Sequence, residues 1–231
     1  MAGHLPGSVC WKQIGMAEMT QPFLVLGATS GIGKLAMHEA LRRGHSVRAF
    51  ARGADKLDQA THLERWRGDA LNTDDIGAAL QGVGCVIYAL GITERLSMLW
   101  EEETLFSRST ALLLEQMKHA GVHRLVAVTG FGAGRSRAAM SSIEKLGHGA
   151  ILGRVYADKS RQEELITQSD LDWTIARPVI LTNRPASGAT RVLSDPATWR
   201  NGLISRADVA VYLIDAVEKG LNIREDVVLT R

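Results

Sequence analysis

The sequence predicts a doubly wound α/β fold around one central, mostly parallel sheet. From Phe23 onward, short apolar runs alternate with longer helical patterns, which is typical of strand–helix–strand units. A glycine-rich turn, Gly27 to Gly33, lies between the first apolar run and the first helical pattern. Folds of this class turn tightly at that point, so both observations favour the same architecture.

Each strand is expected where an apolar run is bounded by turn residues. The expected strands are Phe23–Leu26, Ser46–Ala51, Leu63–Arg67, Cys85–Ala89, Leu125–Thr129 and Trp173–Ala176, with Val227–Leu229 as a candidate seventh. The sheet should therefore hold about six or seven strands.

Helices are expected between the strands, as crossovers that return the chain to the same edge of the sheet. The expected helices are Lys34–Arg43, Thr73–Leu80, Glu101–Ala120, Asp158–Gln168 and Ser205–Lys219. Gly44 and Gly121 follow two of them at the position that favours glycine. The segment from Gly132 to Gly153 is too rich in glycine to assign, and irregular segments after a strand often form a ligand mouth.

Composition favours a small-molecule ligand. The chain has 231 residues and a formal net charge of +2, so no basic surface predicts nucleic acid as a partner. The two cysteines are far apart and the seven histidines are dispersed, so we expect neither a disulfide framework nor a metal site. No apolar run is long enough to span a membrane, and no secretory signal is evident. We expect a cytoplasmic protein, a flexible extension at 1–20 and one domain at 21–231.

The turn after the first strand has the spacing of a phosphate-binding loop. Gly27 permits the tight turn, Gly31 lets the backbone approach a diphosphate, and Gly33 lets the helix pack closely. Free amides at the helix start attract anions. We therefore expect a dinucleotide at Gly27, Thr29, Ser30, Gly31, Ile32 and Gly33. The alternative is a glycine-rich turn that binds nothing.

The tip of the second strand distinguishes the two nicotinamide dinucleotides. NAD binders carry an acid there, whereas NADP binders place an arginine near the 2′-phosphate. The strand ends in Arg52, whose guanidinium can bind phosphate with two hydrogen bonds. We predict NADP(H), while Asp55 keeps NAD(H) open as the alternative.

Two short segments complete the expected cofactor site. Asp69, followed by Ala70, lies after the third strand, where its carboxylate can accept a hydrogen bond from adenine. The alternative role for Asp69 is to cap the helix that follows. Ala89, Leu90 and Gly91 follow the fourth strand. The small backbone of this segment would let the nucleotide pass over the strand ends.

These residues resemble the short-chain dehydrogenase/reductase superfamily, and in particular its atypical NAD(P)H-binding branch of NmrA-like and biliverdin or flavin reductase-like proteins. The motifs that carry the resemblance are Gly68-Asp69, Val128–Gly132, Tyr156–Lys159, Leu171–Pro178 and Ile204–Ala210. The resemblance implies a Rossmann fold with a small C-terminal substrate lobe near residues 180–210. It also implies that Pro178, Val179 and Ile180 flank the nicotinamide.

The resemblance further implies candidate catalytic residues. Tyr156 would act as general acid, Lys159 would bind the ribose, and Thr129 would polarise a carbonyl or contact the nicotinamide amide. However, Tyr156 and Lys159 are three residues apart instead of the usual four, which on a helix puts the lysine roughly 60° behind the tyrosine instead of roughly 40° ahead. For Tyr156 a packing role is the alternative, and for Thr129 a bond to local backbone.

Two functional hypotheses follow. The first is an NADP(H)-dependent oxidoreductase that transfers a hydride to a small planar, quinone- or flavin-like, or carbonyl acceptor. The second is a non-catalytic NADP(H)-binding sensor or scaffold of the NmrA-like kind, which the irregular tyrosine–lysine spacing favours. A sugar-nucleotide epimerase is disfavoured by that spacing and by the short substrate lobe. The expected oligomeric state is a monomer or a homodimer.

Overall fold

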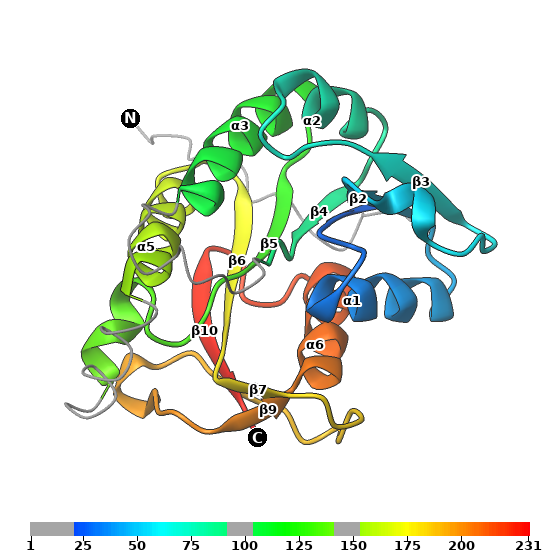
Figure 1. Ribbon diagram of the computed structural model, residues 1–231. Helices are drawn as coiled ribbons and strands as arrows, with labels where there is room; N and C mark the ends of the chain where they lie inside the picture. Colours follow the sequence, from blue (N-terminus) through cyan, green and yellow to red (C-terminus); the bar gives the residue numbers. More distant parts are fainter. Residues whose placement is uncertain (1–20, 92–103, 141–152) are drawn as a thin grey trace, which may run out of the picture.

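A computed structural model describes residues 21–91, 104–140 and 153–231. The expected extension at 1–20 and the segments 92–103 and 141–152 lie outside the described residues. The described chain forms a central sheet with helices on both faces (Figure 1), which confirms the predicted fold class.

The central sheet has eight strands in the order β3-β2-β1-β4-β5-β6-β10-β8. All neighbouring strands are parallel except β8, which is antiparallel to β10. The strands are β1 Phe23–Leu26, β2 Val47–Ala51, β3 Leu63–Arg67, β4 Cys85–Tyr88, β5 Arg124–Val128, β6 Asp172–Pro178, β8 Arg191–Leu193 and β10 Glu225–Thr230. The strand order reverses between β1 and β4, and ligands bind folds of this type at that point.

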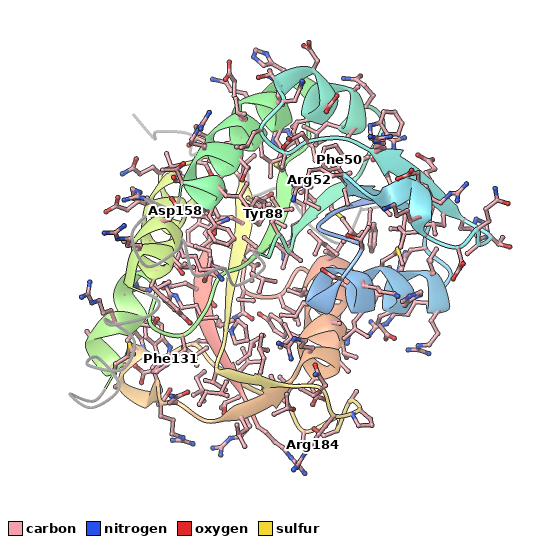
Figure 2. The ribbon with its side chains drawn as sticks, viewed as in Figure 1. Phe50, Arg52, Tyr88, Phe131, Asp158 and Arg184 are labelled. Carbon is pink, nitrogen blue, oxygen red and sulfur yellow. The ribbon has the colours of Figure 1, made fainter. Side chains whose placement is uncertain are left out.

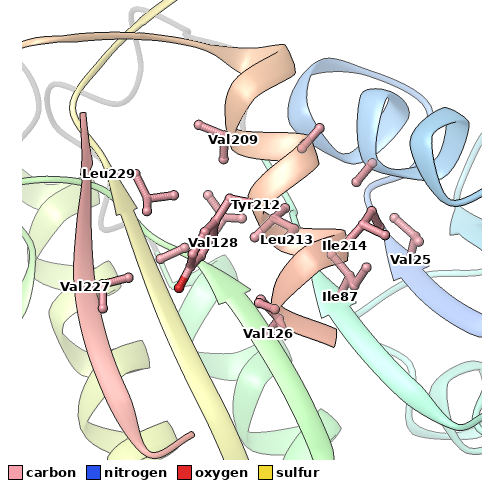
Figure 3. Packing of buried hydrophobic residues seen from close by; sticks show 14 of the residues in the cluster. Val25, Ile87, Val126, Val128, Val209, Tyr212, Leu213, Ile214, Val227 and Leu229 are labelled. Atoms are coloured by element: carbon pink, nitrogen blue, oxygen red, sulfur yellow. The ribbon is translucent and has the colours of Figure 1, made fainter. Parts of the chain in front are cut away.

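Helices cover the two faces in separate groups. On one face, α1 (Gly31–Arg42) packs against α6 (Arg206–Glu218). On the other, α3 (Leu105–Ala120) packs between α2 (Thr73–Ala79) and α5 (Gly153–Thr167). This two-sided cover explains why β1 is apolar at every position: Phe23 and Val25 belong to the first core, and Leu24 and Leu26 to the second. Figure 3 shows the first core, where α6 faces β5 and β10.

Several boundaries differ from those predicted. Helix α1 begins at Gly31, three residues before the predicted start, because the glycine turn itself supplies the first helical turn. Helix α5 begins at Gly153 instead of Asp158, so Tyr156 and Lys159 both lie on it. Strand β6 extends to Pro178, and β8 adds an eighth strand. The predicted helix start at Glu101 lies outside the described residues.

The chain beyond β6 forms the small lobe that the resemblance implied. Strands β7 (Ile180–Thr182) and β9 (Leu203–Ser205) make a separate two-stranded parallel sheet. Short 3-10 turns lie at Pro196–Thr198 in this lobe, and at Ala54–Lys56 and Gly134–Ala139 elsewhere. Ser205 caps α6, with its hydroxyl accepting from the Asp208 amide at 2.9 Å. Figure 1 places the lobe beside the carboxyl end of β6.

Candidate functional site

The turn between β1 and α1 is packed so closely that two of its glycines have no room for a side chain. A Cβ on Gly27 would lie 2.5 Å from the carbonyl oxygen of Ala89, on the neighbouring strand end. A Cβ on Gly33 would lie 2.3 Å from the carbonyl oxygen of Gly27. Gly27 also has a φ of 83°, which side-chain-bearing residues rarely adopt. The turn is therefore pressed against both the strand end and its own helix.

The third glycine is different, because the space around it is open. A Cβ on Gly31 would meet no atom within 4 Å, although its φ is 55°. Ser30, at the N-cap, makes no side-chain hydrogen bond to the helix. The first amides of α1 are therefore left for a ligand or solvent, and they carry the positive end of the helix dipole. The turn is shaped to accept an anion such as a diphosphate.

Arg52 lies at the carboxyl end of β2 (Figure 2), where its side chain is exposed. Within the described residues, its guanidinium has no hydrogen bond or ion pair recorded. Asp55 is also exposed and lies in the 3-10 turn that follows, with its carbonyl bound by Arg65 at 3.1 Å. A cation and an acid are thus both present near the strand end, and the cation is closer to it in the chain.

Asp69 is partly used by the local turn. Its Oδ1 accepts from the Leu71 amide at 3.0 Å, while its own amide donates to Asp75 Oδ2 at 2.8 Å. The helix cap is Asn72, whose Oδ1 accepts from the Asp75 amide at 3.1 Å. The alternative role of Asp69 as the cap of α2 is therefore wrong, because Asn72 holds that place. Ala70 is buried.

The carboxyl end of β4 forms the other wall of the turn. The Ala89 amide donates to Leu26 at 3.0 Å, which holds this backbone against Gly27. Ala89 and Leu90 are half-buried, and Gly91 is exposed.

At the carboxyl end of β5, two glycines make room for the ring of Tyr156. A Cβ on Gly130 would lie 3.3 Å from the Tyr156 hydroxyl, and one on Gly132 would lie 3.3 Å from its Cε1. Burial raises the pKa of the Tyr156 phenol. The phenol is therefore a weaker acid than in water, which does not favour proton donation at neutral pH.

Lys159 lies one turn further along α5. Its Nζ donates to the Thr129 carbonyl at 2.6 Å and lies 5.0 Å from the centre of the Phe106 ring. Burial lowers the pKa of Lys159 to about 8, although Glu163 opposes the shift. A substantial fraction of the lysine is therefore neutral slightly above physiological pH.

The Thr129 hydroxyl is engaged as well. It donates to Glu163 Oε1 at 2.6 Å, so in this arrangement its proton is directed at a carboxylate instead of a carbonyl substrate. The proposed alternative, a bond to local backbone, is not what the structure shows either. Thr129 is held at both ends by α5, through Glu163 and Lys159.

Behind Thr129 lie ion pairs that were not predicted from the sequence. Arg177 binds both oxygens of Glu163, at 3.0 Å from Nε and 2.7 Å from Nη2. Its Nη1 lies 2.5 Å from Asp226, which also pairs with Arg135. Arg177 is 2% exposed. A charged residue inside an apolar strand was the available signal, because such a residue is buried only when it is paired.

The three residues implied to flank the nicotinamide differ in access. Pro178 and Val179 are buried, and Val179 belongs to the hydrophobic core. Ile180 is 57% exposed and pairs in register with Leu203, which is 55% exposed. Only Ile180 therefore offers a side chain at the surface.

The candidate residues form two groups. The first group follows strands β1 to β4 and comprises Gly27–Gly33, Arg52, 69–70 and 89–91. The second group lies on or around the ends of β5 and β6 and comprises Thr129, Tyr156, Lys159 and 178–180. Because all these strands are parallel, both groups lie along one edge of the sheet. A dinucleotide could extend from the first group to the second.

No group of three or more metal-binding side chains occurs at 21–91, 104–140 or 153–231. Among the described helices, none has the length and apolar character needed to cross a membrane.

Comparison with known proteins supports the same kind of ligand. A family model described as NAD(P)H-binding matches residues 27–220. An uncharacterized chloroplastic protein of Arabidopsis thaliana is 28% identical over 211 residues, which cover 87% of this chain and 73% of the plant protein.

Two solved structures share the fold. ChuY, an anaerobilin reductase from Escherichia coli O157:H7, has a TM-score of 0.74 and 24% identity, covering 90% of this chain and 96% of that one. A short-chain dehydrogenase/reductase from Veillonella parvula DSM 2008, in complex with NADP, has a TM-score of 0.77 and 15% identity, covering 91% and 94%. At these identities the likeness shows a shared fold, which is the fold that the resemblance implied.

Proposed function

The chain belongs to the NAD(P)H-binding family, and on that premise we propose that it is an NADP(H)-dependent reductase of a small planar or carbonyl acceptor. The observation that carries this proposal is the uncapped start of α1. Gly27 and Gly33 are closed to any side chain, whereas the space beside Gly31 is open and Ser30 leaves the helix amides free. A glycine turn that binds nothing would not need tight packing at Gly27 and Gly33 together with open space beside Gly31.

The choice of NADP(H) over NAD(H) depends on Arg52. Its guanidinium is exposed at the end of β2 and has no recorded partner in the described chain. A 2′-phosphate would supply that partner through charge-assisted hydrogen bonds. The Veillonella protein was solved with NADP, which is consistent with this choice but is a property of that protein.

When bound, the reduced nicotinamide supplies the hydride, and the chain supplies binding and orientation. The amides of α1 would bind the diphosphate, and Lys159 would bind the ribose. Tyr156 is poorly suited to donate a proton, because burial raises the pKa of its phenol. Thr129 directs its hydroxyl proton at Glu163. An acceptor that takes its proton from solvent, such as a quinone, a flavin or a linear tetrapyrrole, fits this site best.

The experiment is a binding titration followed by an NADPH oxidation assay. Calorimetry with NADPH and NADH tests the cofactor, and a panel of quinones, flavins, linear tetrapyrroles and aldehydes tests the acceptor. The tetrapyrrole is included because ChuY is described as an anaerobilin reductase. Reduction of one planar class with little turnover of aldehydes would support the proposal. No binding of either nucleotide at millimolar concentration would contradict it.

A second candidate is a sensor that binds NADP(H) without turnover. The observation that favours it is that the three candidate catalytic groups are all constrained: Lys159 donates to Thr129, Thr129 donates to Glu163, and the Tyr156 phenol is a weakened acid. Tight NADPH binding with no acceptor reduced would support the sensor and end the reductase proposal.

We also propose that the protein acts in the cytoplasm as a monomer or homodimer. Expression of a fluorescent fusion in the source cell and light scattering of the purified chain test these two statements. Fluorescence confined to an organelle or a higher oligomer would contradict them.

A further inference from the structure

The strongest feature outside the proposed cofactor turn is the way Thr129 is held by one face of α5. Its carbonyl accepts from Lys159 Nζ at 2.6 Å, and its hydroxyl donates to Glu163 at 2.6 Å. Lys159 and Glu163 are four residues apart, so they lie on the same face of the helix. Thr129, at the carboxyl edge of the sheet, is thus hydrogen-bonded to Lys159 and Glu163, which lie one helical turn apart on α5.

Glu163 is itself fixed from the opposite side. Arg177 binds both of its oxygens, and the carboxylate is 3% exposed. A Cβ on Gly134 would lie 1.8 Å from Glu163 Oε2, so the loop after β5 covers the pair directly. The Gly134 amide in turn donates to Ser160 at 2.9 Å. The carboxylate is therefore held beside Thr129 by contacts from α5, β6 and the loop after β5.

We propose that Glu163 is a positioning residue that keeps Lys159 a cation directed at the carboxyl edge of β5, where the dinucleotide binds. This inference rests on the proposed function, because it assigns Lys159 to that ligand. Glu163 holds the Thr129 side chain, and Thr129 offers the carbonyl that anchors the ammonium. The negative charge of Glu163 also favours the protonated amine over the neutral one.

The groups around Lys159 identify Glu163 as the acid that acts on it. Glu163 is the charged group that acts on Lys159, Arg177 of β6 pairs with Glu163, and the Phe106 ring of α3 lies 5.0 Å from the Lys159 Nζ. On α5, Asp158 directly precedes Lys159 in the chain. Asp158 is committed elsewhere: its Oδ2 accepts from the Phe106 amide at 2.8 Å and its Oδ1 lies 3.4 Å from Arg161. Glu163 opposes the effect of burial on the pKa of Lys159, which is about 8.

The test is the Glu163→Gln variant, which keeps the shape and a hydrogen-bond acceptor for Thr129 but removes the charge. NADPH affinity of the unchanged protein should fall as pH rises through about 8, because the cation is lost. In Glu163→Gln the midpoint should lie about 1 pH unit lower, because an opposite charge has been removed. Glu164→Gln is the matched control: the same change at the next residue, which is exposed, should leave the midpoint in place.

A readout on the ligand-free protein separates this proposal from the proposed function. Titration of the lysine ¹³Cε signals by NMR follows Lys159 directly, with its signal assigned from its absence in Lys159→Met. A lower midpoint in Glu163→Gln than in Glu164→Gln supports the role of Glu163 even if no nucleotide binds. An unchanged midpoint in a folded Glu163→Gln protein overturns it, even if NADPH binds well.

Thr129→Val provides a second variant in case Glu163→Gln fails to fold. It removes the hydroxyl while leaving the charge of Glu163 and the carbonyl that anchors Lys159. NADPH affinity should fall about tenfold with the pH midpoint unchanged, since one hydrogen bond is lost but the charge remains. An unchanged NADPH affinity in Thr129→Val would contradict the proposal that Glu163 positions Lys159 through Thr129.

Discussion

A side chain on Gly27 would place its Cβ 2.5 Å from the carbonyl oxygen of Ala89. The two residues follow β1 and β4, the strands between which the strand order reverses. The turn that would bind the dinucleotide and the neighbouring strand end are therefore in direct backbone contact, and a side chain on one must displace the other.

Gly27→Ala should lower the free energy of unfolding by about 3 kcal/mol, because a backbone clash adds to the cost of a positive φ. Urea unfolding measures the change. Gly31→Ala is the control: its φ is also positive, but a Cβ there meets no atom within 4 Å. Gly31→Ala should lower the free energy of unfolding by about 1 kcal/mol, because only the cost of a side chain at a positive φ applies there. Equal losses in the two variants would contradict the close contact with Ala89.

Arg52→Asp should weaken NADPH binding by about tenfold to a hundredfold, because one or two charge-assisted hydrogen bonds are lost. NADH lacks the 2′-phosphate, so its affinity should change much less or improve. Calorimetry with both nucleotides makes the comparison. Arg191→Asp, at an exposed position of β8, carries the same change in charge and should affect both nucleotides equally. Equal losses in Arg52→Asp would show that Arg52 does not distinguish the cofactors.

Tyr156→Phe should reduce turnover with a quinone, flavin or tetrapyrrole acceptor by less than about threefold, because such acceptors take a proton from solvent. A general acid contributes about a hundredfold or more where it acts. Steady-state NADPH oxidation at neutral pH measures the effect. A hundredfold loss of kcat with unchanged KM would instead assign the proton donor to Tyr156.

Acid should weaken the ion pairs that Glu39 makes with Arg42 and Arg43 at the end of α1. Hydrogen bonds from Arg42 lower the pKa of Glu39 to about 2, with Arg43 contributing and burial opposing. Because the folded pKa lies below the unfolded one, the stabilisation is present above about pH 4.5 and is lost as pH falls toward 2. Because Arg42 is exposed and solvent screens the pair, Glu39→Gln should lower the free energy of unfolding by about 1 kcal/mol at pH 6 and by less at pH 3.

Urea unfolding at the two pH values measures this difference. Glu115→Gln, on the exposed side of α3, serves as control because its carboxylate is exposed and lies as far as 4.0 Å from the exposed His119 ring nitrogen. A loss in Glu39→Gln that is independent of pH would contradict the ion-pair origin.

The positions of the strands in the chain could be predicted from the sequence because period and turn chemistry are local. Three local signals each favour one backbone conformation, and neighbouring residues do not override them. They are the apolar runs, the Gly27–Gly33 spacing and Gly121. Helix starts were less accurate: α5 begins five residues before its predicted start at Asp158, in a glycine-rich stretch whose pattern is weak.

The site behind Thr129 could not be predicted in the same way. Arg177 stands out as a charge inside an apolar strand, but its partners Glu163 and Asp226 lie 14 and 49 residues away in the chain, and nothing in the sequence connects them to it. They become a buried network only when α5, β6 and β10 come together. The burial of Pro178 and Val179 could not be predicted either, because it depends on β10: Pro178 pairs in register with Leu229, and the Val179 amide donates to the Leu229 carbonyl at 3.1 Å.

The sequence by itself determined the α/β class, the glycine turn and the exposed arginine at the end of β2, since these are properties of adjacent residues. Only the tertiary structure decided which side chains at the carboxyl edge remain available. Packing assigned the Thr129 hydroxyl to Glu163 and the Lys159 ammonium to the Thr129 carbonyl, because a buried polar group must find its partner in three dimensions.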